Sequence, residues 1–529
     1  MTVHRAPESF ELEDYLAAQE RKSLLRFITC GSVDDGKSTL IGRLLYESKR
    51  LFDDQLATLE RDSRKHGTQG GEIDFSLLVD GLASEREQGI TIDVAYRFFS
   101  TDRRTFIVAD TPGHEQYTRN MATGASTADV AILLIDARKG ITRQTRRHAL
   151  LVSMLGTRHI ALAINKMDLV NWSEAKFNEI VAAFHIFSGN LGFERVTAVP
   201  LSALHGDNIV RPPPQAAWYQ GPTLLSYLET VEVVPRGGAE PFRLPVQWVN
   251  RPNPDFRGFA GLITSSVIRV GERVRVVPSG LESTVAGIVT FDGNLDEAVA
   301  GQSVTLILSD EVDVSRGDII ASVEQAPHVS DRIDARLFWM AREHLKEGDQ
   351  FLLKLGTQTV PVTVIAVRQK IDLATLTPVN VSSLGANDIG DVILTADYPV
   401  AFDTYAESRC TGGFILINRE SFDTVAIGLV SGLGHSSQDQ TEVDQSRAQK
   451  TWLKPPSERP WRSVLKAISW RITGSLDTMV VAFFFTQNVR LSAAIGATEV
   501  LTKLVLYYGH ERLWDRIMFG LIRSGDGPR

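Results

Sequence analysis

Residues 31–38 match the pattern G-x-x-x-x-G-K-[ST] at every fixed position, and few folds can accommodate such a loop. The stretch reads Gly31-Ser32-Val33-Asp34-Asp35-Gly36-Lys37-Ser38 and continues with Thr39. An apolar run at 25–30 precedes it, and a run with helical periodicity at 39–45 follows it. A strand, a glycine turn and a helix N-terminus direct backbone N–H groups and the positive end of the helix dipole to one place. The sequence therefore predicts a phosphate-binding loop, in which Lys37 neutralises the β- and γ-phosphates and Ser38 holds Mg²⁺.

Three further motifs follow β-like runs; one belongs with Mg²⁺ and the phosphates, and the other two indicate the base. The first is Asp110-Thr111-Pro112-Gly113-His114, where the carboxylate serves Mg²⁺ and the glycine senses the γ-phosphate. The second is Asn165-Lys166-Met167-Asp168, whose last carboxylate can accept two hydrogen bonds from guanine that adenine does not offer. The third is Ser202-Ala203-Leu204, the usual position for a backbone N–H onto the guanine carbonyl. Four motifs in this order predict a GTP-binding, doubly wound α/β domain with a mostly parallel sheet.

Residues 89–92 read Gly89-Ile90-Thr91-Ile92, and by themselves they equally fit the start of a plain strand. Together with Asp-Thr-Pro-Gly-His they resemble the translation-factor class of GTPases. The resemblance implies that Thr91 binds Mg²⁺ with Ser38 and Asp110 when GTP is bound, and that His114 orients the attacking water. It also matches Asp34 to an aspartate that helps to bind a monovalent cation in some members.

A narrower resemblance is to the GTPase subunits of heterodimeric ATP sulfurylases (sulfate adenylyltransferases). It covers about residues 10–432 and is carried by residues 31–44, 78–82, 85–97, 120–129, 249–253 and 255–258. This family implies a GTPase domain followed by two small β-barrels. It also implies a partner, the ATP-pyrophosphatase-like small subunit, which makes adenylylsulfate and pyrophosphate from ATP and sulfate while GTP hydrolysis offsets an unfavourable equilibrium.

The sequence itself offers no second site for adenylyl transfer. It contains no second phosphate-binding motif and no Ser-Gly-Gly-x-Asp-Ser loop, and no two of its eleven histidines are three positions apart. We therefore expect the adenylyl-transfer site on a separate subunit. Two alternatives stay open at this point: a translation-type GTPase that binds aminoacyl-tRNA, and a membrane-tethered regulatory GTPase.

Composition narrows the partners and the compartment. The formal net charge is −8. Sequence-independent binding of nucleic acid needs a basic surface, so this charge argues against it. The two cysteines cannot build a disulfide framework, and the N-terminal residues lack an apolar signal core. We therefore expect a cytoplasmic protein that binds no nucleic acid.

The pattern of apolar runs and turn-forming residues along the chain predicts six segments. They are an N-terminal helical extension at 1–23, the GTP-binding domain at 24–236, one β-barrel at 240–328, a second at 329–432, a polar linker at 433–458, and a helical segment at 459–523. Short β-runs interrupted by Gly, Pro and Asp indicate the barrels, and one of these runs covers 260–270.

The segment at 459–523 contains two apolar runs, at 472–485 and 491–508, that approach the length needed to span a bilayer. Charges at Asp477, Glu499 and Lys503 interrupt them. The segment resembles a family of small predicted membrane proteins of unknown function. We expect a helical hairpin that contacts a membrane, and a soluble hairpin with its charges exposed is the alternative.

Overall fold

The computed structural model describes residues 22–48, 58–61, 63, 73–79, 91–233, 240–253 and 256–433. The chain divides into two compact units, Met1–His435 and Ser436–Arg529, and all described residues belong to the first. Most of the predicted N-terminal extension, nearly all of the predicted linker, and the whole predicted hairpin at 459–523 lie outside the described residues, as do Gly89 and Ile90.

The first domain is built on a six-stranded sheet in the order β2-β3-β1-β4-β5-β6. Its strands are β1 (Ser23–Cys30), β2 (Ala95–Ser100), β3 (Arg104–Asp110), β4 (Val130–Asp136), β5 (His159–Asn165) and β6 (Arg195–Pro200). Only β2, at the edge, runs antiparallel to its neighbour within this sheet. The central strand β4 reads VAILLID and is buried along its whole length, because helices cover both faces of a parallel sheet. The predicted doubly wound, mostly parallel fold is confirmed.

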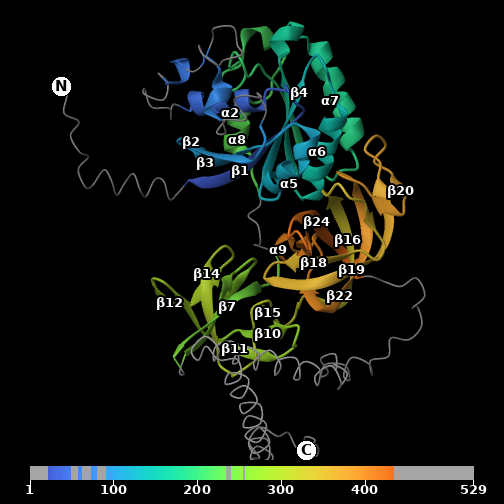
Figure 1. Cartoon of the computed structure of the whole chain (residues 1–529). Coiled ribbons are helices and arrows are strands. Elements are labelled where there is room, and N and C mark those ends of the chain that lie inside the picture. The colour runs from blue at the N-terminus through green and yellow to red at the C-terminus, as the bar shows by residue number, and fades with distance from the viewer. Residues whose placement is uncertain are drawn as a thin grey trace, which may run out of the picture. The chain divides into compact units, whose positions relative to one another are not determined.

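Two sets of helices cover the two faces of this sheet (Figure 1). Helices α2 (Lys37–Glu47) and α8 (Leu224–Thr230) share one apolar core with the sheet. Helices α5 (Thr118–Ala125), α6 (Arg143–Met154) and α7 (Glu174–Ser188) share the other. Short 3₁₀ turns are η1 (Phe75–Leu78), η2 (Glu115–Tyr117), η3 (Met167–Val170) and η4 (Pro214–Ala216). The four predicted nucleotide motifs follow the carboxyl ends of β1, β3, β5 and β6, where doubly wound sheets bind their ligands.

The second domain is an antiparallel barrel, in agreement with the prediction. Its strands are β7 (Arg243–Asn253), β8 (Phe256–Leu262), β9 (Val267–Arg269), β10 (Arg273–Val277), β11 (Glu282–Thr290), β12 (Gly293–Leu295), β13 (Glu297–Val299), β14 (Ser303–Leu308) and β15 (Ile319–Ser322). The sheet order is β10-β15-β7-β8-β14-β11-β12, and an additional pairing of β10 with β11 closes the ring. Strands β9 and β13 form a separate pair.

One expectation for this barrel is wrong, because the run at 260–270 is not a single strand. Strand β8 ends at Leu262 and β9 begins at Val267. Between them the chain turns towards Arg243, whose carbonyl accepts a hydrogen bond from the Thr264 amide at 3.0 Å. Ser266 adopts a φ of 63°, which a continuous strand does not allow.

The third domain is also a closed antiparallel barrel. Its elements are β16 (His328–Trp339), β17 (Leu345–Lys346), β18 (Gln350–Leu355), β19 (Gln358–Ile371), β20 (Pro378–Asn380), β21 (Ser383–Leu384), β22 (Ile389–Phe402), α9 (Arg409–Gly412), β23 (Gly413–Asn418) and β24 (Thr424–Leu433). The order is β18-β23-β24-β16-β22-β19-β20, with β18 also paired to β19.

A buried ion pair joins the two barrels. Arg243 on β7 donates to both carboxylate oxygens of Asp403, which follows β22, at 2.9 and 2.8 Å. The two side chains are 2% and 7% exposed, and the Thr411 hydroxyl donates a further hydrogen bond to Asp403 at 2.5 Å. Because one partner without the other would leave a buried charge unpaired, the pair fixes the barrels to each other.

Candidate nucleotide-binding site

The predicted phosphate-binding loop connects β1 to α2. Asp34 and Gly36 adopt positive φ values of 67° and 91°, which turn the chain sharply into the helix. The Ser32 amide donates to the Asp35 carboxylate at 2.6 Å. Lys37, the first residue of α2, is buried and donates to the Ser32 carbonyl at 2.9 Å. Burial lowers the pKa of Lys37, and the nearby Asp110 carboxylate opposes this shift. The loop thus holds an ammonium group within itself, where a phosphate chain would need it.

The three predicted Mg²⁺ ligands meet beside this loop. The Ser38 hydroxyl donates to Asp110 Oδ2 at 2.9 Å and lies 3.3 Å from Thr91 Oγ1. The other Asp110 oxygen accepts a hydrogen bond from Thr29 at 3.1 Å. Burial raises the pKa of Asp110, while Lys37 and the hydrogen bond from Ser38 counteract the rise. Three oxygen donors from distant parts of the chain therefore lie together.

Residues Thr111, Pro112 and Gly113 run closely past the phosphate-binding loop. The Thr111 hydroxyl donates to the Thr29 carbonyl at 2.6 Å. A Cβ on Gly113 would lie 2.8 Å from the Val33 nitrogen and 2.5 Å from Lys37 Nζ. Real Cβ atoms do not approach other atoms so closely, so this position requires glycine.

His114 caps the turn η2, and Nδ1 of its ring accepts a hydrogen bond from the Gln116 amide at 3.3 Å. A neutral ring with this bond carries its proton on Nε2, which leaves an N–H donor at the far side of the ring. The orientation of His114 therefore depends on the position of the turn that follows it.

The motifs predicted to recognise the base are tied to the phosphate-binding loop through Asn165. Its amide nitrogen donates to the Asp35 carbonyl at 2.7 Å, and its amide oxygen accepts from the Ala203 backbone at 2.9 Å. The next residue, Lys166, has a φ of 62°, donates to the Asp34 carbonyl and lies 3.2 Å from the Asp136 carboxylate. One side chain thus connects three of the four motifs.

The remaining residues predicted to recognise the base lie in the same region. Asp168, whose side chain is 21% exposed, lies 3.9 Å from His205 Nε2. The Ser202 amide donates to the Asp207 carbonyl at 3.2 Å, in the turn that continues through Leu204. Burial alone would raise the pKa of Asp136, but hydrogen bonds from Arg138 and Lys166 outweigh it and lower that pKa to about 2. The turn and the ion pairs keep Ala203 and Lys166 in place.

Sequence reasoning missed the contacts that helix α6 makes with this site. Thr142 lies 2.7 Å from the Ser32 hydroxyl, and His148 Nδ1 accepts a hydrogen bond from the Gly31 amide at 3.1 Å. Arg147 on the same helix forms an ion pair with Glu115 at 2.7 Å. The Thr142–Thr145 capping box was a readable signal for the start of the helix, but no local pattern indicates what a helix will lie against.

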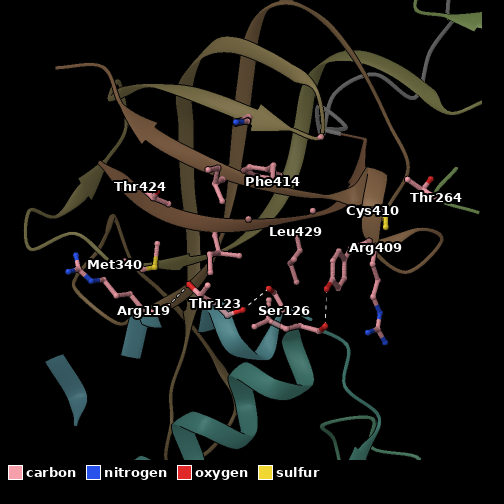
Figure 2. Close-up of a pocket in the computed structure, with 18 of the residues that line it drawn as sticks. Arg119, Thr123, Ser126, Thr264, Met340, Arg409, Cys410, Phe414, Thr424 and Leu429 are labelled. Carbon is pink, nitrogen blue, oxygen red and sulfur yellow. Dashed lines mark hydrogen bonds between the residues drawn. The ribbon is translucent and has the colours of Figure 1, made fainter. Parts of the chain in front are cut away.

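A separate cavity of about 880 Å³ lies against α5 (Figure 2). Arg119 and Thr123 of α5 and Ser126 at its C-terminal cap form one wall, and Phe414, Thr424 and Leu429 of the third domain form the other. Tyr405 and Leu155 also line it, and the Tyr405 hydroxyl donates to the Leu155 carbonyl at 2.8 Å. Its lining contains none of the predicted nucleotide-site residues.

The described part of the chain has no group of three or more His, Cys, Asp or Glu side chains that could hold a metal ion. A site with one carboxylate and two hydroxyls suits Mg²⁺, which keeps water and phosphate oxygens as its other ligands. None of the described helices is both long enough and apolar enough to cross a bilayer.

Comparison with known families agrees with the order of the domains. Residues 22–235 match the family described as "Elongation factor Tu GTP binding domain", and residues 332–431 match "GTP-eEF1A C-terminal domain-like". Residues 464–515 match "Predicted membrane protein (DUF2061)", the kind of family expected for this segment. A solved structure of sup35 with GDP is 24% identical, with a TM-score of 0.36, and the match covers 78% of this chain and 95% of that one.

Curated relatives give a narrower result. The sulfate adenylyltransferase subunit 1 of Methylorubrum extorquens is 60% identical over 437 residues, which cover 83% of this chain and 93% of the relative. The protein of the same name from Methylorubrum populi is 61% identical over 430 residues, covering 81% and 92%. That of Aeromonas hydrophila is 53% identical over 440 residues, covering 82% and 93%. With the four motifs in place and this identity over most of its length, the chain belongs to the sulfate adenylyltransferase subunit 1 family.

Proposed function

We propose that this chain is the GTP-hydrolysing subunit of a sulfate adenylyltransferase. It binds GTP with Mg²⁺, hydrolyses it, and couples that hydrolysis to the formation of adenylylsulfate and pyrophosphate from ATP and sulfate on a separate subunit. The name of its relatives, subunit 1, supports a complex with at least one other chain. The anhydride between phosphate and sulfate is very unstable to hydrolysis, so its synthesis needs a coupled source of free energy.

The observation that carries the GTP part of this proposal is the bridging position of Asn165. Its side chain hydrogen-bonds the phosphate-binding loop at Asp35 and the backbone of Ala203. A base held by Asp168 and the Ala203 region would therefore belong to the same nucleotide whose phosphates lie on the Gly31–Thr39 loop. The Asp168 carboxylate would accept hydrogen bonds from guanine N1–H and the 2-amino group, and this pairing would exclude adenine.

The residues at the phosphate end fit a magnesium ion. Ser38, Thr91 and Asp110 would hold it, because their oxygens already lie within hydrogen-bonding distance of Ser38 Oγ. Mg²⁺ bound there would neutralise charge on the β- and γ-phosphate oxygens. Lys37 adds a second positive charge to the same phosphates, and the Gly113 backbone lies close enough to respond to a γ-phosphate.

We assign the orientation of the attacking water to His114. Hydrolysis of a phosphoanhydride needs mainly placement and charge stabilisation, so one well-oriented side chain on the water is sufficient. The hydrogen bond from the Gln116 amide to Nδ1 leaves Nε2 of the ring to face the water. His114→Ala should then slow hydrolysis by orders of magnitude while GTP still binds.

The proposed partner is the ATP-pyrophosphatase-like small subunit, which would carry the ATP and sulfate sites. The experiment is co-purification of the two chains, followed by measurement of pyrophosphate released from ATP and sulfate. We expect the extent of the reaction to increase with GTP and not with a non-hydrolysable GTP analogue. If GTP leaves the extent unchanged, the coupling is refuted.

We also propose that the protein is cytoplasmic and contacts a membrane through residues 459–523, supported by the family match at 464–515. Co-sedimentation with lipid vesicles, compared between the full chain and a variant without 459–523, tests this contact. Equal sedimentation of the two would contradict it.

A further inference from the structure

Helix α6 begins beside the phosphate-binding loop and contacts its first two residues. Its N-cap, Thr142, lies 2.7 Å from the Ser32 hydroxyl. The fully buried His148 accepts a hydrogen bond from the Gly31 amide at Nδ1, over 3.1 Å. Burial lowers the pKa of His148 to about 3, so the ring stays neutral and can accept this bond. Helix α6 is thereby held in register with the loop.

The same helix also holds the segment that follows His114. Arg147 has a side chain that is 3% exposed, and its Nη2 lies 2.7 Å from Glu115 Oε1. Its Nη1 donates to Gln144 Oε1 at 2.9 Å. The amide nitrogen of Gln144, Nε2, lies 2.8 Å from His148 Nε2. A continuous chain of side chains therefore leads from Glu115 to the Gly31 amide.

Proton positions show why Glu115 matters most to Arg147. Since the Gly31 amide donates to Nδ1, neutral His148 carries its proton on Nε2 and needs an acceptor there. The Gln144 amide oxygen can satisfy either His148 or Arg147, but not both at once. Within the described residues, Glu115 is the one carboxylate paired with Arg147, and Arg147 Nε is buried without a hydrogen-bond partner. A buried guanidinium in this setting strongly favours keeping its carboxylate.

Glu115 is the first residue of η2, the turn that orients His114. The amide that bonds His114 Nδ1 belongs to Gln116, the next residue. The Glu115 carbonyl also accepts a hydrogen bond from the Thr118 hydroxyl at 2.7 Å. The ion pair with Arg147 therefore anchors the residue that lies between His114 and the amide that bonds its ring.

We propose that Arg147 is a positioning residue for GTP hydrolysis, acting through its ion pair with Glu115 on the turn that orients His114. The inference rests on the proposed function, because it requires His114 to act on the attacking water. Arg147 itself touches no reacting atom. It keeps the His114 turn aligned with the loop that α6 also contacts.

The test uses the full chain and four variants: Arg147→Met, Arg147→Lys, Glu115→Gln, and the double variant Arg147→Met with Glu115→Gln. Equilibrium binding of GTP and single-turnover hydrolysis of bound GTP are measured for each. A misplacement of about 1 Å at a reacting centre costs about 10²-fold in rate, so a partial loss of alignment should lower the rate about 10-fold or more. We expect Arg147→Met and Glu115→Gln to show this loss with GTP affinity within about two-fold of the parent. Arg147→Lys should recover part of the rate.

The double variant separates this mechanism from general damage. If Arg147 acts through Glu115, the double variant should hydrolyse GTP no more slowly than Arg147→Met, because the two losses are one event. Arg243→Met is the matched control, since it removes another buried arginine from a carboxylate without touching the site. It should hydrolyse GTP at the parental rate. Glu115 is 53% exposed, so Glu115→Gln keeps the test valid if Arg147→Met does not fold.

Three results would overturn the inference: parental rates in both single variants, a loss of GTP affinity as large as the loss of rate, or losses that multiply in the double variant. His114→Ala distinguishes this failure from a failure of the proposed function. If His114→Ala is slow while Arg147→Met and Glu115→Gln are fast, only the role of Arg147 is wrong. If His114→Ala is as fast as the parent, the assignment of His114 is wrong.

Discussion

The close approach of Gly113 to the phosphate-binding loop gives a sharp prediction for Gly113→Ala. The added methyl carbon would lie 2.8 Å from the Ser32 carbonyl carbon, 2.8 Å from the Val33 nitrogen and 2.5 Å from Lys37 Nζ. The lysine is a flexible side chain and can move, but the other two atoms are backbone. A normal contact needs about 3.5 Å, so the Gly113 segment and the loop must separate by about 0.7 Å.

That separation sets the expected magnitude. The displaced segment carries His114 on one side and Asp110 on the other, and both are assigned to hydrolysis. A misplacement approaching 1 Å costs about 10²-fold, so kcat at saturating GTP should fall about 10²-fold. Affinity for GDP should change much less, because GDP has no γ-phosphate at the displaced segment.

The assay is single-turnover hydrolysis at saturating GTP, with GDP affinity measured in parallel. Gly189→Ala is the matched control: it lies in the same domain, its φ is −54°, and its new methyl would meet its nearest neighbour at an ordinary 3.5 Å. A Gly113→Ala protein that hydrolyses GTP within about three-fold of the parent would refute the argument from close approach.

Three further predictions concern other parts of the molecule. His148 is neutral in the folded state, with a pKa lowered to about 3, whereas an unfolded histidine binds a proton below about pH 6.5. The stability that it contributes is therefore complete above about pH 6.5 and decreases by about 1.4 kcal/mol per unit as the pH falls towards 3; urea unfolding of His148→Gln should show a shallower pH dependence, and parallel curves would contradict this. Asp168→Asn should weaken GTP binding by about 10²- to 10⁴-fold, because two hydrogen bonds to a charged group are lost at about 1.5–3 kcal/mol each; calorimetry should show a smaller loss for inosine triphosphate, which lacks the 2-amino group, and an equal loss would count against guanine recognition by Asp168. Arg243→Met should lower the free energy of unfolding by about 3–5 kcal/mol, since it leaves Asp403 buried without its partner; a change below about 1 kcal/mol in urea titrations would contradict the importance of this pair.

The residues that the sequence could predict are those that belong to short motifs with fixed spacing. Lys37 and Ser38 follow from one motif and Asp110 from another, and the alternation of strands and helices brings both motifs to the same edge of a parallel sheet. The closed barrels were predictable as a class for the same reason, because short β-runs with turn residues between them are local features.

Two other features were beyond such reasoning. The break within 260–270 depends on a hydrogen bond from Thr264 to Arg243, and no glycine or proline marks it between Leu262 and Val267. The contacts of Thr142 and His148 with the phosphate-binding loop depend on which helix packs beside that loop. Both are long-range choices of the folded chain, and a window of local sequence does not contain them.

The ion pair between Arg243 and Asp403 has a consequence for how this chain could do work on another subunit. Two barrels joined by a buried, bidentate ion pair resist rotation relative to each other, so they move as one rigid body. A partner bound to either barrel would be displaced at the same moment, and only the size of its displacement would depend on where it binds.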